Sequence, residues 1–530
     1  MADYKQTALY LLSKYGLADT FLDLLQRLPL DVPRDPVEAV DPRVREFTFD
    51  SRPDGKVLLP LFPSYQVNEG IQAILGHAFH TRGIDTLHVH CDEGLPVCCL
   101  DDVTKYGSAI RSVCRFNTGQ ITGSFGLDAR SAREVLPPDY SPPTFSAGED
   151  VVHRGVDVTD LCFASTREYF KKYNVDLGDE RERDVFDRYC ETAVTLLDAY
   201  DALFEAHDVA AVVAFEDHYV YGGTALALAA ERSIPAYSVD LGYQTETLMF
   251  GRWGNRNSLP MYTDHDTLVS VLREPLDDAQ EARIDDLMRG RMDGTTTRFQ
   301  YSAQTDKSIE AGEDVTTVGV FTNLSWDATT EIEEAAFPDM FDWVATTVDE
   351  LGGRPGVRLV VKTHPAEAVR FTREPVGEWI HDNLGPVPDN VEVLPPDTDV
   401  NTYRLASDLD LAAVYSSIVG LEMAYLGIPV VVAGDTHYRD LGITADPSTR
   451  EEYLELVTDP STASTDAERA KRYAHFFYYD KHVPFPFVTS DSDGENIRIL
   501  PVSHDDVVPG NESLDRITES ILAGEPVLMD

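Results

Sequence analysis

The chain has 530 residues, which is too long for a single hydrophobic core and predicts two or three domains. With 43% hydrophobic and 10% aromatic residues, each domain can be a packed globular one. No run approaches the roughly 18 consecutive apolar residues of a membrane-spanning helix, so none is expected. Aspartate and glutamate number 92 against 44 lysine and arginine, and the resulting net charge of −48 excludes a basic surface that could bind nucleic acid.

The chain begins with a stretch whose apolar spacing predicts an amphipathic helix over 1–30, within an N-terminal helical extension over 1–45. This stretch lacks a basic segment followed by an apolar segment and a small-residue cleavage site, so it does not read as a signal peptide. We therefore expect a protein of the cytoplasm, with peripheral association at the inner face of the membrane left open.

Residues 46–300 predict a first Rossmann-like domain, because short apolar runs alternate with helical patterns. The strands are expected at 56–62, 84–90, 209–215 and 234–240, and the helices at 71–80, 165–208 and 224–233. The stretch 91–146 is expected to be rich in loops, and the proline-rich segment 137–148 within it is expected to lack regular structure. Residues 290–314 are polar and acidic and predict a linker.

Residues 315–455 predict a second Rossmann-like domain, in which strand and helix alternate with few interruptions. The strands are expected at 316–323, 357–365, 390–396, 408–416 and 428–434, and the helices at 333–351, 366–384, 400–407 and 418–426. Residues 456–530 predict a C-terminal helix and an acidic tail. The expected fold class is α/β, with two Rossmann-like domains facing each other across a cleft.

Four of the six cysteines lie between Cys91 and Cys114, but no C-x-x-C pair is present. A metal site that combines Cys91, Cys98 or Cys99 with Cys114 is one interpretation. Reduced thiols packed beneath a loop are the interpretation that we prefer, because a cytoplasmic protein keeps its cysteines reduced. We expect no metal and no cofactor.

The acidic residues are spread along the whole chain, and only 10 of the basic residues are lysine. At 1 M salt the Debye length falls to about 3 Å, so the mutual repulsion of so many carboxylates is screened. The composition therefore predicts a protein adapted to molar salt, as in a halophilic archaeon.

Polar residues in the second domain follow strands at the edge where parallel sheets bind ligands. Lys362 and His364 end one predicted strand, where they could meet a phosphate, and Thr322 and Asn323 end another. Each of these residues could equally belong to a plain turn or a cap.

Two further loops of this domain lie at the same predicted edge. Ser416 and Ser417 precede a helix whose N-terminus favours an anion, and Glu422 lies in its first turns. The loop from Gly434 to Arg439 adds a cation after the last strand. The alternative is that a serine caps the helix and that Glu422 only interacts favourably with the positive end of the helix dipole.

The order of these motifs resembles the nucleotide-sugar half of glycosyltransferases with two Rossmann-like domains (the GT-B type). It is most similar to the capsule polysaccharide biosynthesis family, which includes Kdo-type transferases, and shares motifs with bacterial sialyltransferase-like enzymes. The stretches that carry the resemblance are FTNLSWDA, VVKTHPAEA, VYSSIVGLEMAYLGIPVVVAG and, more weakly, CDEGLPVCC.

The resemblance implies that a nucleotide-sugar donor is a co-substrate and that its sugar passes to a carbohydrate or lipid-linked acceptor of a surface polysaccharide or glycan. It implies that His364 stabilises the donor phosphate, that Ser416 and Ser417 bind this phosphate, and that Glu422 binds the ribose. It also implies that Asp92 or Glu93 is the catalytic base.

Three residues at another predicted strand end, Glu216, Asp217 and His218, are rival candidates for the base. Because no D-x-D motif stands at a matching strand end, we expect catalysis to be independent of metal. Two alternative functions remain open: a sugar-nucleotide epimerase of the same fold, and a non-catalytic subunit of a polysaccharide assembly or export machine.

Overall fold

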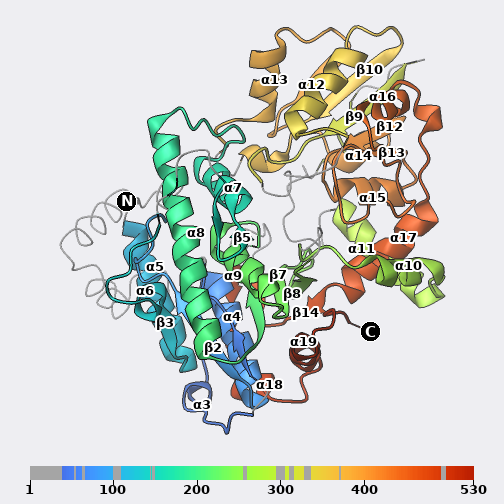
Figure 1. Cartoon of the computed structure of the whole chain (residues 1–530). Coiled ribbons are helices and arrows are strands. Elements are labelled where there is room, and N and C mark those ends of the chain that lie inside the picture. The colour runs from blue at the N-terminus through green and yellow to red at the C-terminus, as the bar shows by residue number, and fades with distance from the viewer. Residues whose placement is uncertain are drawn as a thin grey trace, which may run out of the picture. The chain divides into compact units, whose positions relative to one another are not determined.

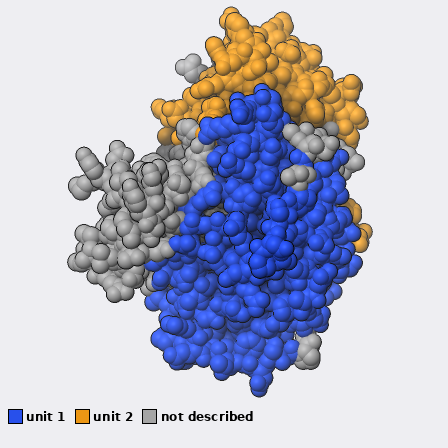
Figure 2. Space-filling model, turned by 60° about the vertical axis from the view of Figure 1, so that its left-hand side comes forward, with its two compact units in different colours: residues 1–170, 175–262, 481–530 blue, residues 171–174, 263–480 orange. Residues whose placement is uncertain are grey.

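The computed structural model describes residues 39–52, 55–62, 66–98, 109–143, 145, 150–215, 217–254, 259–293, 305–309, 315–327, 336–368, 372–490 and 497–529. The helix predicted over 1–30 lies outside these residues. The chain folds into two compact units, coloured separately in Figure 2. Unit 1 comprises residues 1–170, 175–262 and 481–530, and unit 2 comprises residues 171–174 and 263–480.

Unit 1 is built on a seven-stranded sheet of order β14-β8-β7-β6-β1-β2-β3 (Figure 1). The strands from β3 to β7 are parallel, and β8 and β14 join antiparallel. The strands are β1 (Lys56–Leu58), β2 (Asp85–His90), β3 (Ala129–Ser131), β6 (Val209–Ala214), β7 (Ala236–Leu241), β8 (Thr247–Arg252) and β14 (Val483–Pro484). The expected parallel core of this sheet is confirmed.

Helices cover both faces of this sheet because the buried strand residues alternate between two apolar clusters. Val212 and Ala214 of β6 belong to one cluster, whereas Ala211 and Val213 belong to the other. The helices of the first cluster are α6 (Ala132–Val135), α7 (Thr159–Phe170), α8 (Glu180–Ala206) and α9 (Val220–Glu231), and those of the second are α3 (Pro42–Arg45), α4 (Gln66–Thr81), α5 (Ala109–Phe125), α18 (His504–Val507) and α19 (Glu512–Ala523).

The stretch 91–146, expected to be rich in loops, also contains α5, β3 and α6, which the sequence did not predict. Two glycines and two threonines give α5 a weak intrinsic helix propensity. The helix forms because Ile121 and Phe125 pack into the cluster that α4 shares, and such packing overrides propensity.

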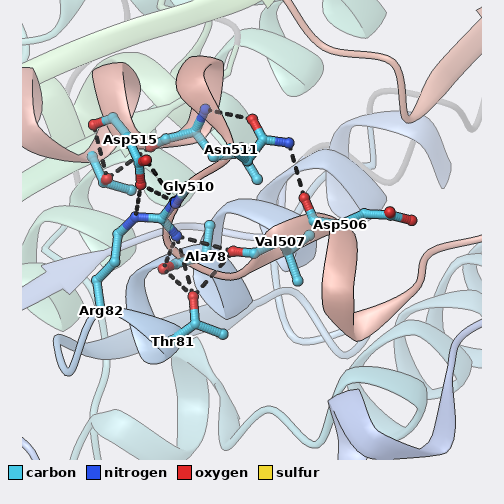
Figure 3. Close-up of polar contacts among 10 residues, drawn as sticks. Ala78, Thr81, Arg82, Asp506, Val507, Gly510, Asn511 and Asp515 are labelled. Atoms are coloured by element: carbon cyan, nitrogen blue, oxygen red, sulfur yellow. Dashed lines mark hydrogen bonds and ion pairs between the residues drawn. The ribbon is translucent and has the colours of Figure 1, made fainter.

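The C-terminal part of unit 1 is fixed to the end of α4 by Arg82 (Figure 3). Its guanidinium donates to Asp515 of α19 through Nε, at 3.0 Å, and Nη2, at 2.5 Å, while Nη1 donates to the carbonyls of Ala78 and Val507. Asp515 also accepts from the amide of Gly510 at 2.8 Å. The segment predicted as an acidic tail is therefore an integral part of this unit.

Small elements complete unit 1. They are the hairpin of β4 (Val152–His153) with β5 (Val156–Asp157) and the antiparallel pair of β15 (Val488–Ser490) with β16 (Ile497–Ile499). Within the described part of the chain, no helix is both long and apolar enough to cross a bilayer.

Unit 2 contains a five-stranded, fully parallel sheet of order β11-β10-β9-β12-β13. The strands are β9 (Thr316–Phe321), β10 (Val357–Lys362), β11 (Val391–Leu394), β12 (Leu411–Val414) and β13 (Val430–Val432). All five lie within the ranges predicted from the sequence. The doubly wound α/β fold expected here is thus observed, whereas its apposition to unit 1 across a cleft stays a prediction.

The helices of unit 2 follow its strands, as Figure 1 shows, and α12, α13 and α16 pack on one face of the sheet. The helices are α10 (His265–Arg273), α11 (Asp278–Met292), α12 (Met340–Leu351), α13 (Val376–Leu384), α14 (Thr402–Ala406), α15 (Val419–Tyr425), α16 (Arg450–Thr458) and α17 (Ala467–His475). Single turns occur at η2 (Pro365–Ala368) and η3 (Pro460–Thr462), and α17 runs into a π-helical turn, η4 (Phe476–Asp480).

The compact units divide the chain elsewhere than at the predicted domain boundaries. Residues 263–293 form α10 and α11 of unit 2, and the predicted C-terminal region contributes α17 to unit 2 and everything after Asp480 to unit 1. Apolar packing sets these divisions, and α11 and α17 pack on each other within unit 2.

Candidate functional site

The carboxyl ends of four strands in unit 2 are level with one another. Phe321 pairs with Lys362 on one side and with Val414 on the other, and Val414 pairs with Val432. The strand order reverses direction at β9, so β9 and β12 flank the topological switch point, where doubly wound sheets bind ligands. The structure therefore brings the four loops singled out from the sequence to one edge, which we call the donor edge (residues 322–323, 362–367, 415–417 and 434–439).

Lys362 is the last residue of β10 and is buried, with 3% of its surface exposed. Among the described residues, its ammonium group has no hydrogen-bond or ion-pair partner. Burial lowers the pKa of Lys362 to about 8. A buried ammonium without a counter-ion is costly, so this position suits a protein whose bound ligand supplies the negative charge.

His364 lies two residues beyond Lys362, before the single turn η2. Its Nδ1 accepts the amide proton of Ala366 at 3.1 Å. This bond fixes the orientation of the ring and, in the neutral imidazole, leaves the hydrogen on Nε2. His364 is half-buried, and its Nε2–H can act as a hydrogen-bond donor to an anionic oxygen.

The ends of β9 and β12 are joined through Asn323, whose Oδ1 accepts from the amide of Ser416 at 3.2 Å. Beside this bond, the hydroxyl oxygens of Thr322 and Ser416 are buried and have no hydrogen-bond partner among the described residues. An unpartnered buried hydroxyl costs about 1–3 kcal/mol. Two of them at the switch point indicate a place that a polar ligand or ordered water completes.

Ser417 is held from two sides. Its Oγ accepts from the amide of Val419 at 3.3 Å, and its carbonyl accepts from the hydroxyl of Tyr438 at 2.5 Å. Gly420 leaves the space that Tyr438 needs, because a Cβ at this position would collide with the Tyr438 hydroxyl. The loop after β12 is thereby fixed by the loop after β13.

Glu422 is the predicted ribose ligand, and the structure shows its carboxylate fully engaged. Oε1 accepts from Arg291 Nε at 2.6 Å and from the hydroxyl of Tyr478 at 3.3 Å, and Oε2 accepts from the hydroxyl of Tyr403 at 2.8 Å. Glu422 is 1% exposed. This buried ion pair and its hydrogen bonds join α11, α14, α15 and η4. The binding of a ribose by Glu422 stays a prediction, and it requires that ribose hydroxyls replace some of these hydrogen bonds.

Arg439 uses its guanidinium to bind backbone carbonyls. Nη1 donates to Val432 at 2.9 Å and to Gly434 at 2.6 Å, and Nη2 donates to Pro447 at 2.6 Å. Gly434 is required by close packing, because a Cβ there would lie 2.7 Å from the carbonyl oxygen of Tyr415. In this structure both residues shape the loop after β13, and their donor-binding role is still a prediction.

Sequence reasoning missed Glu367 in η2. Its Oε1 accepts from the amide of Val376 at 3.2 Å, while Oε2 is buried without a partner among the described residues. Burial raises the pKa of Glu367 to about 7. The sequence holds one signal for it, since Glu367 follows the K-x-H-P motif within a single turn.

The predicted bases Asp92 and Glu93 form an exposed turn after β2. Their φ angles are 46° and 57°, a left-handed conformation that is uncommon outside glycine and often marks functional loops. Glu93 Oε1 lies 3.6 Å from Arg115 Nε. The role of this turn in catalysis stays a prediction.

The rival candidates lie after β6, although Glu216 itself is outside the described residues. Asp217 is 6% exposed, and its Oδ2 has no hydrogen-bond partner among the described residues. Burial raises the pKa of Asp217. The Nε2 of His218 is likewise buried without a partner in the described chain.

Of the four cysteines between Cys91 and Cys114, Cys99 lies outside the described residues. Burial raises the pKa of the Cys91 thiol. Where the structure describes the chain, no group of three or more His, Cys, Asp or Glu side chains is arranged to hold a metal ion.

No protein-family model matches the sequence, and a search of curated proteins gives no match. Among solved structures, the chain is similar to the β-Kdo 2,4-transferase KpsC of Thermosulfurimonas dismutans, with 16% identity, a TM-score of 0.34 and coverage of 50% of this chain and 79% of that one.

It is also similar to a UDP-GlcNAc 2-epimerase from Neisseria meningitidis bound to UDP-GlcNAc, with 13% identity, a TM-score of 0.25 and coverage of 79% and 97%. The spinosyn rhamnosyltransferase SpnG matches with 12% identity, a TM-score of 0.23 and coverage of 80% and 96%. With identities and TM-scores this low, the functional argument rests on the residues of this chain.

Proposed function

We propose that the protein is a nucleotide-sugar-dependent glycosyltransferase of the cytoplasm, acting without a metal in the synthesis of a surface polysaccharide or glycan. Its acceptor is a carbohydrate or a lipid-linked carbohydrate. The observation that carries the proposal is Lys362, a buried ammonium without a partner among the described residues, at the ligand edge of a doubly wound sheet. A phosphorylated ligand supplies the charge that this residue lacks.

The neighbouring groups suit the leaving group of such a reaction. Sugar transfer breaks the bond between the anomeric carbon and a phosphate oxygen, so negative charge accumulates on the departing nucleotide. Lys362 offers a positive charge, and His364 offers its Nε2–H in an orientation fixed by Ala366. Preorganised donors of this kind stabilise a developing charge without reorganisation during the reaction.

The hydroxyls of Thr322 and Ser416 provide further partners for phosphate oxygens, because both can donate a hydrogen bond and neither has another partner among the described residues. The buried position of these groups also suits a protein that works in concentrated salt. Salt screens exposed ion pairs strongly and buried ones much less.

The first experiment measures the binding and hydrolysis of UDP-, GDP-, CMP- and dTDP-sugars in molar KCl by calorimetry and by nucleotide release. One donor class should bind, and Lys362→Met should weaken its binding at least tenfold, which is about 1.4 kcal/mol. His364→Ala should slow nucleotide release more than it weakens binding, because its bond gains strength as the phosphate gains charge.

Lys307→Met is the matched control, because Lys307 is an exposed lysine of the same unit paired with Asp399. It should leave donor binding unchanged. If folded wild-type protein binds none of the donors, both the transferase and its epimerase alternative are refuted.

A further inference from the structure

Unit 1 repeats the topology of unit 2. Leu58 of β1 pairs with Leu87 of β2 on one side and with Val212 of β6 on the other, so the strand order reverses at β1. The edge beyond the carboxyl ends of β1, β2 and β6 is therefore the ligand edge of this unit. We call it the acceptor edge and define it by Gln72, His90, Asp217 and His218.

Each of these four residues has a buried polar atom without a hydrogen-bond partner in the part of the chain that the structure describes: Gln72 Oε1, His90 Nδ1, Asp217 Oδ2 and His218 Nε2. They come from three elements, namely α4 after β1, the last residue of β2, and the loop after β6. Native proteins leave few such atoms unpaired, because each costs about 1–3 kcal/mol. Their concentration at one sheet edge indicates a site that a ligand or ordered water completes.

Two of the side chains are held in place by their other atoms. Gln72 Nε2 donates to the carbonyl of Val213 in β6 at 2.9 Å, which assigns the unpaired atom as the amide oxygen. Asp217 interacts with the hydroxyl of Ser238 on β7 and with its neighbour His218. The unpaired oxygens are therefore positioned by the sheet and are not mobile ends of exposed side chains.

The character of these atoms defines the ligand. Gln72 Oε1 and an ionised Asp217 can only accept hydrogen bonds, so the ligand must donate them. Arginines on the elements that follow β2 and β3 are engaged, since Arg115 lies 3.6 Å from Glu93, Arg133 donates to the carbonyl of Gly94 at 2.9 Å, and Arg111 also has an interaction partner. The acceptor edge thus suits a neutral molecule rich in hydroxyl groups, in contrast to the donor edge, where the ammonium of Lys362 has no partner in the described part of the chain.

We propose that the acceptor edge binds a neutral, hydroxyl-rich acceptor and that Asp217 is the base that activates it. This inference rests on the proposed glycosyl transfer. The carboxylate of Asp217 takes the proton of the acceptor hydroxyl, and the acceptor oxygen forms a bond to the anomeric carbon of the donor. The bond between that carbon and the phosphate oxygen breaks, and its electron pair leaves with the nucleotide.

Burial supports this role, because it raises the pKa of Asp217 and so makes its carboxylate a stronger base. The alternative bases Asp92 and Glu93 are both exposed, and Glu93 lies close to Arg115. Neither of them is buried at the sheet edge as Asp217 is.

The experiment compares wild type with Asp217→Asn and with Asp208→Asn, an exposed residue just before β6. The donor identified by the nucleotide screen is mixed with glycerol as a small hydroxyl acceptor, in molar KCl. Asp217→Asn should lower transfer to glycerol and to water by roughly 100-fold, the usual scale for loss of a general base, while donor affinity stays unchanged. Asp208→Asn should change neither quantity.

A second measurement needs no ligand. Because burial disfavours the charged form of Asp217 in the free protein, Asp217→Asn should leave the melting temperature unchanged or raise it. A fall of several degrees would instead assign Asp217 a structural role and overturn the proposal.

Three further outcomes are distinct. Transfer that survives Asp217→Asn, or a wild type that binds donor yet transfers to neither glycerol nor water, overturns the role of Asp217 and leaves the donor site intact. Absence of donor binding in folded wild type removes the proposed function itself.

Discussion

Lys362 gives the donor edge a group that changes its charge just above neutral pH. Its pKa lies at about 8 in the free protein because of burial, and a bound phosphate raises the pKa again by favouring the charged form. Binding is therefore accompanied by proton uptake above pH 8. Donor affinity should be constant from about pH 7 to 8 and then fall, by up to about tenfold for each further pH unit.

Calorimetry of donor binding between pH 7 and pH 10 tests this dependence. Lys362→Arg keeps its charge over the whole range, so it should bind more weakly at pH 7 but lose the decline above pH 8. A wild-type affinity that stays flat to pH 10 would show that the phosphate does not meet Lys362.

The candidate residues that the sequence could predict are those whose signal is local. Lys362, His364 and Ser416 follow directly on apolar runs, and their positions at a strand end come from that adjacency alone. The engagement of Glu422 could not be predicted in the same way, because its partner Arg291 lies 131 residues away. The sequence also does not reveal that Arg439 donates to backbone carbonyl oxygens, because every residue has a carbonyl and no side chain marks the ones that are bound.

At the scale of elements, buried histidines connect α4, β2 and α18. His80 and His88 both contact the hydroxyl of Thr86, at 2.7 and 2.8 Å, and His77 Nε2 lies 3.1 Å from His504 Nδ1. Burial lowers the pKa of His77 to about 3, of His80 to about 4 and of His88 to about 3. The folded unit therefore keeps these three rings neutral in mild acid.

This cluster predicts the acid sensitivity of unit 1. The unfolded chain binds protons at these histidines below pH 6.5 and the folded one does not, so stability is retained above pH 6.5 and lost as pH falls below it. With three groups the loss approaches about 4 kcal/mol per pH unit near pH 5. Urea unfolding of unit 1 at pH 7, 6 and 5 measures the slope.

Two variants locate the effect. His88→Gln removes one of the three groups and should reduce the slope by about 1.4 kcal/mol per pH unit. His381→Gln is the control, because His381 is exposed on unit 2, and it should leave the slope unchanged. An equal slope in wild type and His88→Gln would contradict the assignment.

The elements that could be predicted are those with a strong apolar signature. The strands of unit 2 consist of short apolar runs, and all five were located from the sequence. Helix α5 was missed because Gly119 and Gly123 interrupt its pattern, and its stability depends on packing against α4. The strand β8, which pairs antiparallel with both β7 and β14, was missed because it carries less of the continuous apolar signal of a buried parallel strand.

At the scale of the whole molecule, the sequence predicted two doubly wound sheets from the repeated alternation of strand and helix. It could not predict that residues after Asp480 return to the first unit. That return depends on contacts such as the one between Arg82 and Asp515, which are 433 residues apart. Contacts at this separation leave no periodic pattern in the sequence.

The net charge of −48 predicts how the fold responds to salt. Mutual repulsion of the carboxylates disfavours the compact state, and raising KCl from 0.1 M to 1 M shortens the Debye length from about 10 Å to about 3 Å. The melting temperature at pH 7 should therefore rise by many degrees over this range. Scanning calorimetry in KCl and in NaCl measures the increment, and the two salts should act alike because screening depends on ionic strength.

The control repeats the comparison of the two KCl concentrations at a lower pH, where the net charge of the protein is smaller. The net charge vanishes near the pI of about 4.4, and at pH 5 the ordinary pKa values of Asp, Glu and His already reduce it to roughly half, so much less repulsion remains to be screened. The increment in melting temperature from 0.1 M to 1 M KCl should be much smaller at pH 5 than at pH 7, even though the histidine cluster makes the protein less stable there. Equal increments at both pH values would show that salt acts by strengthening apolar burial, and the acidic surface would then need another explanation.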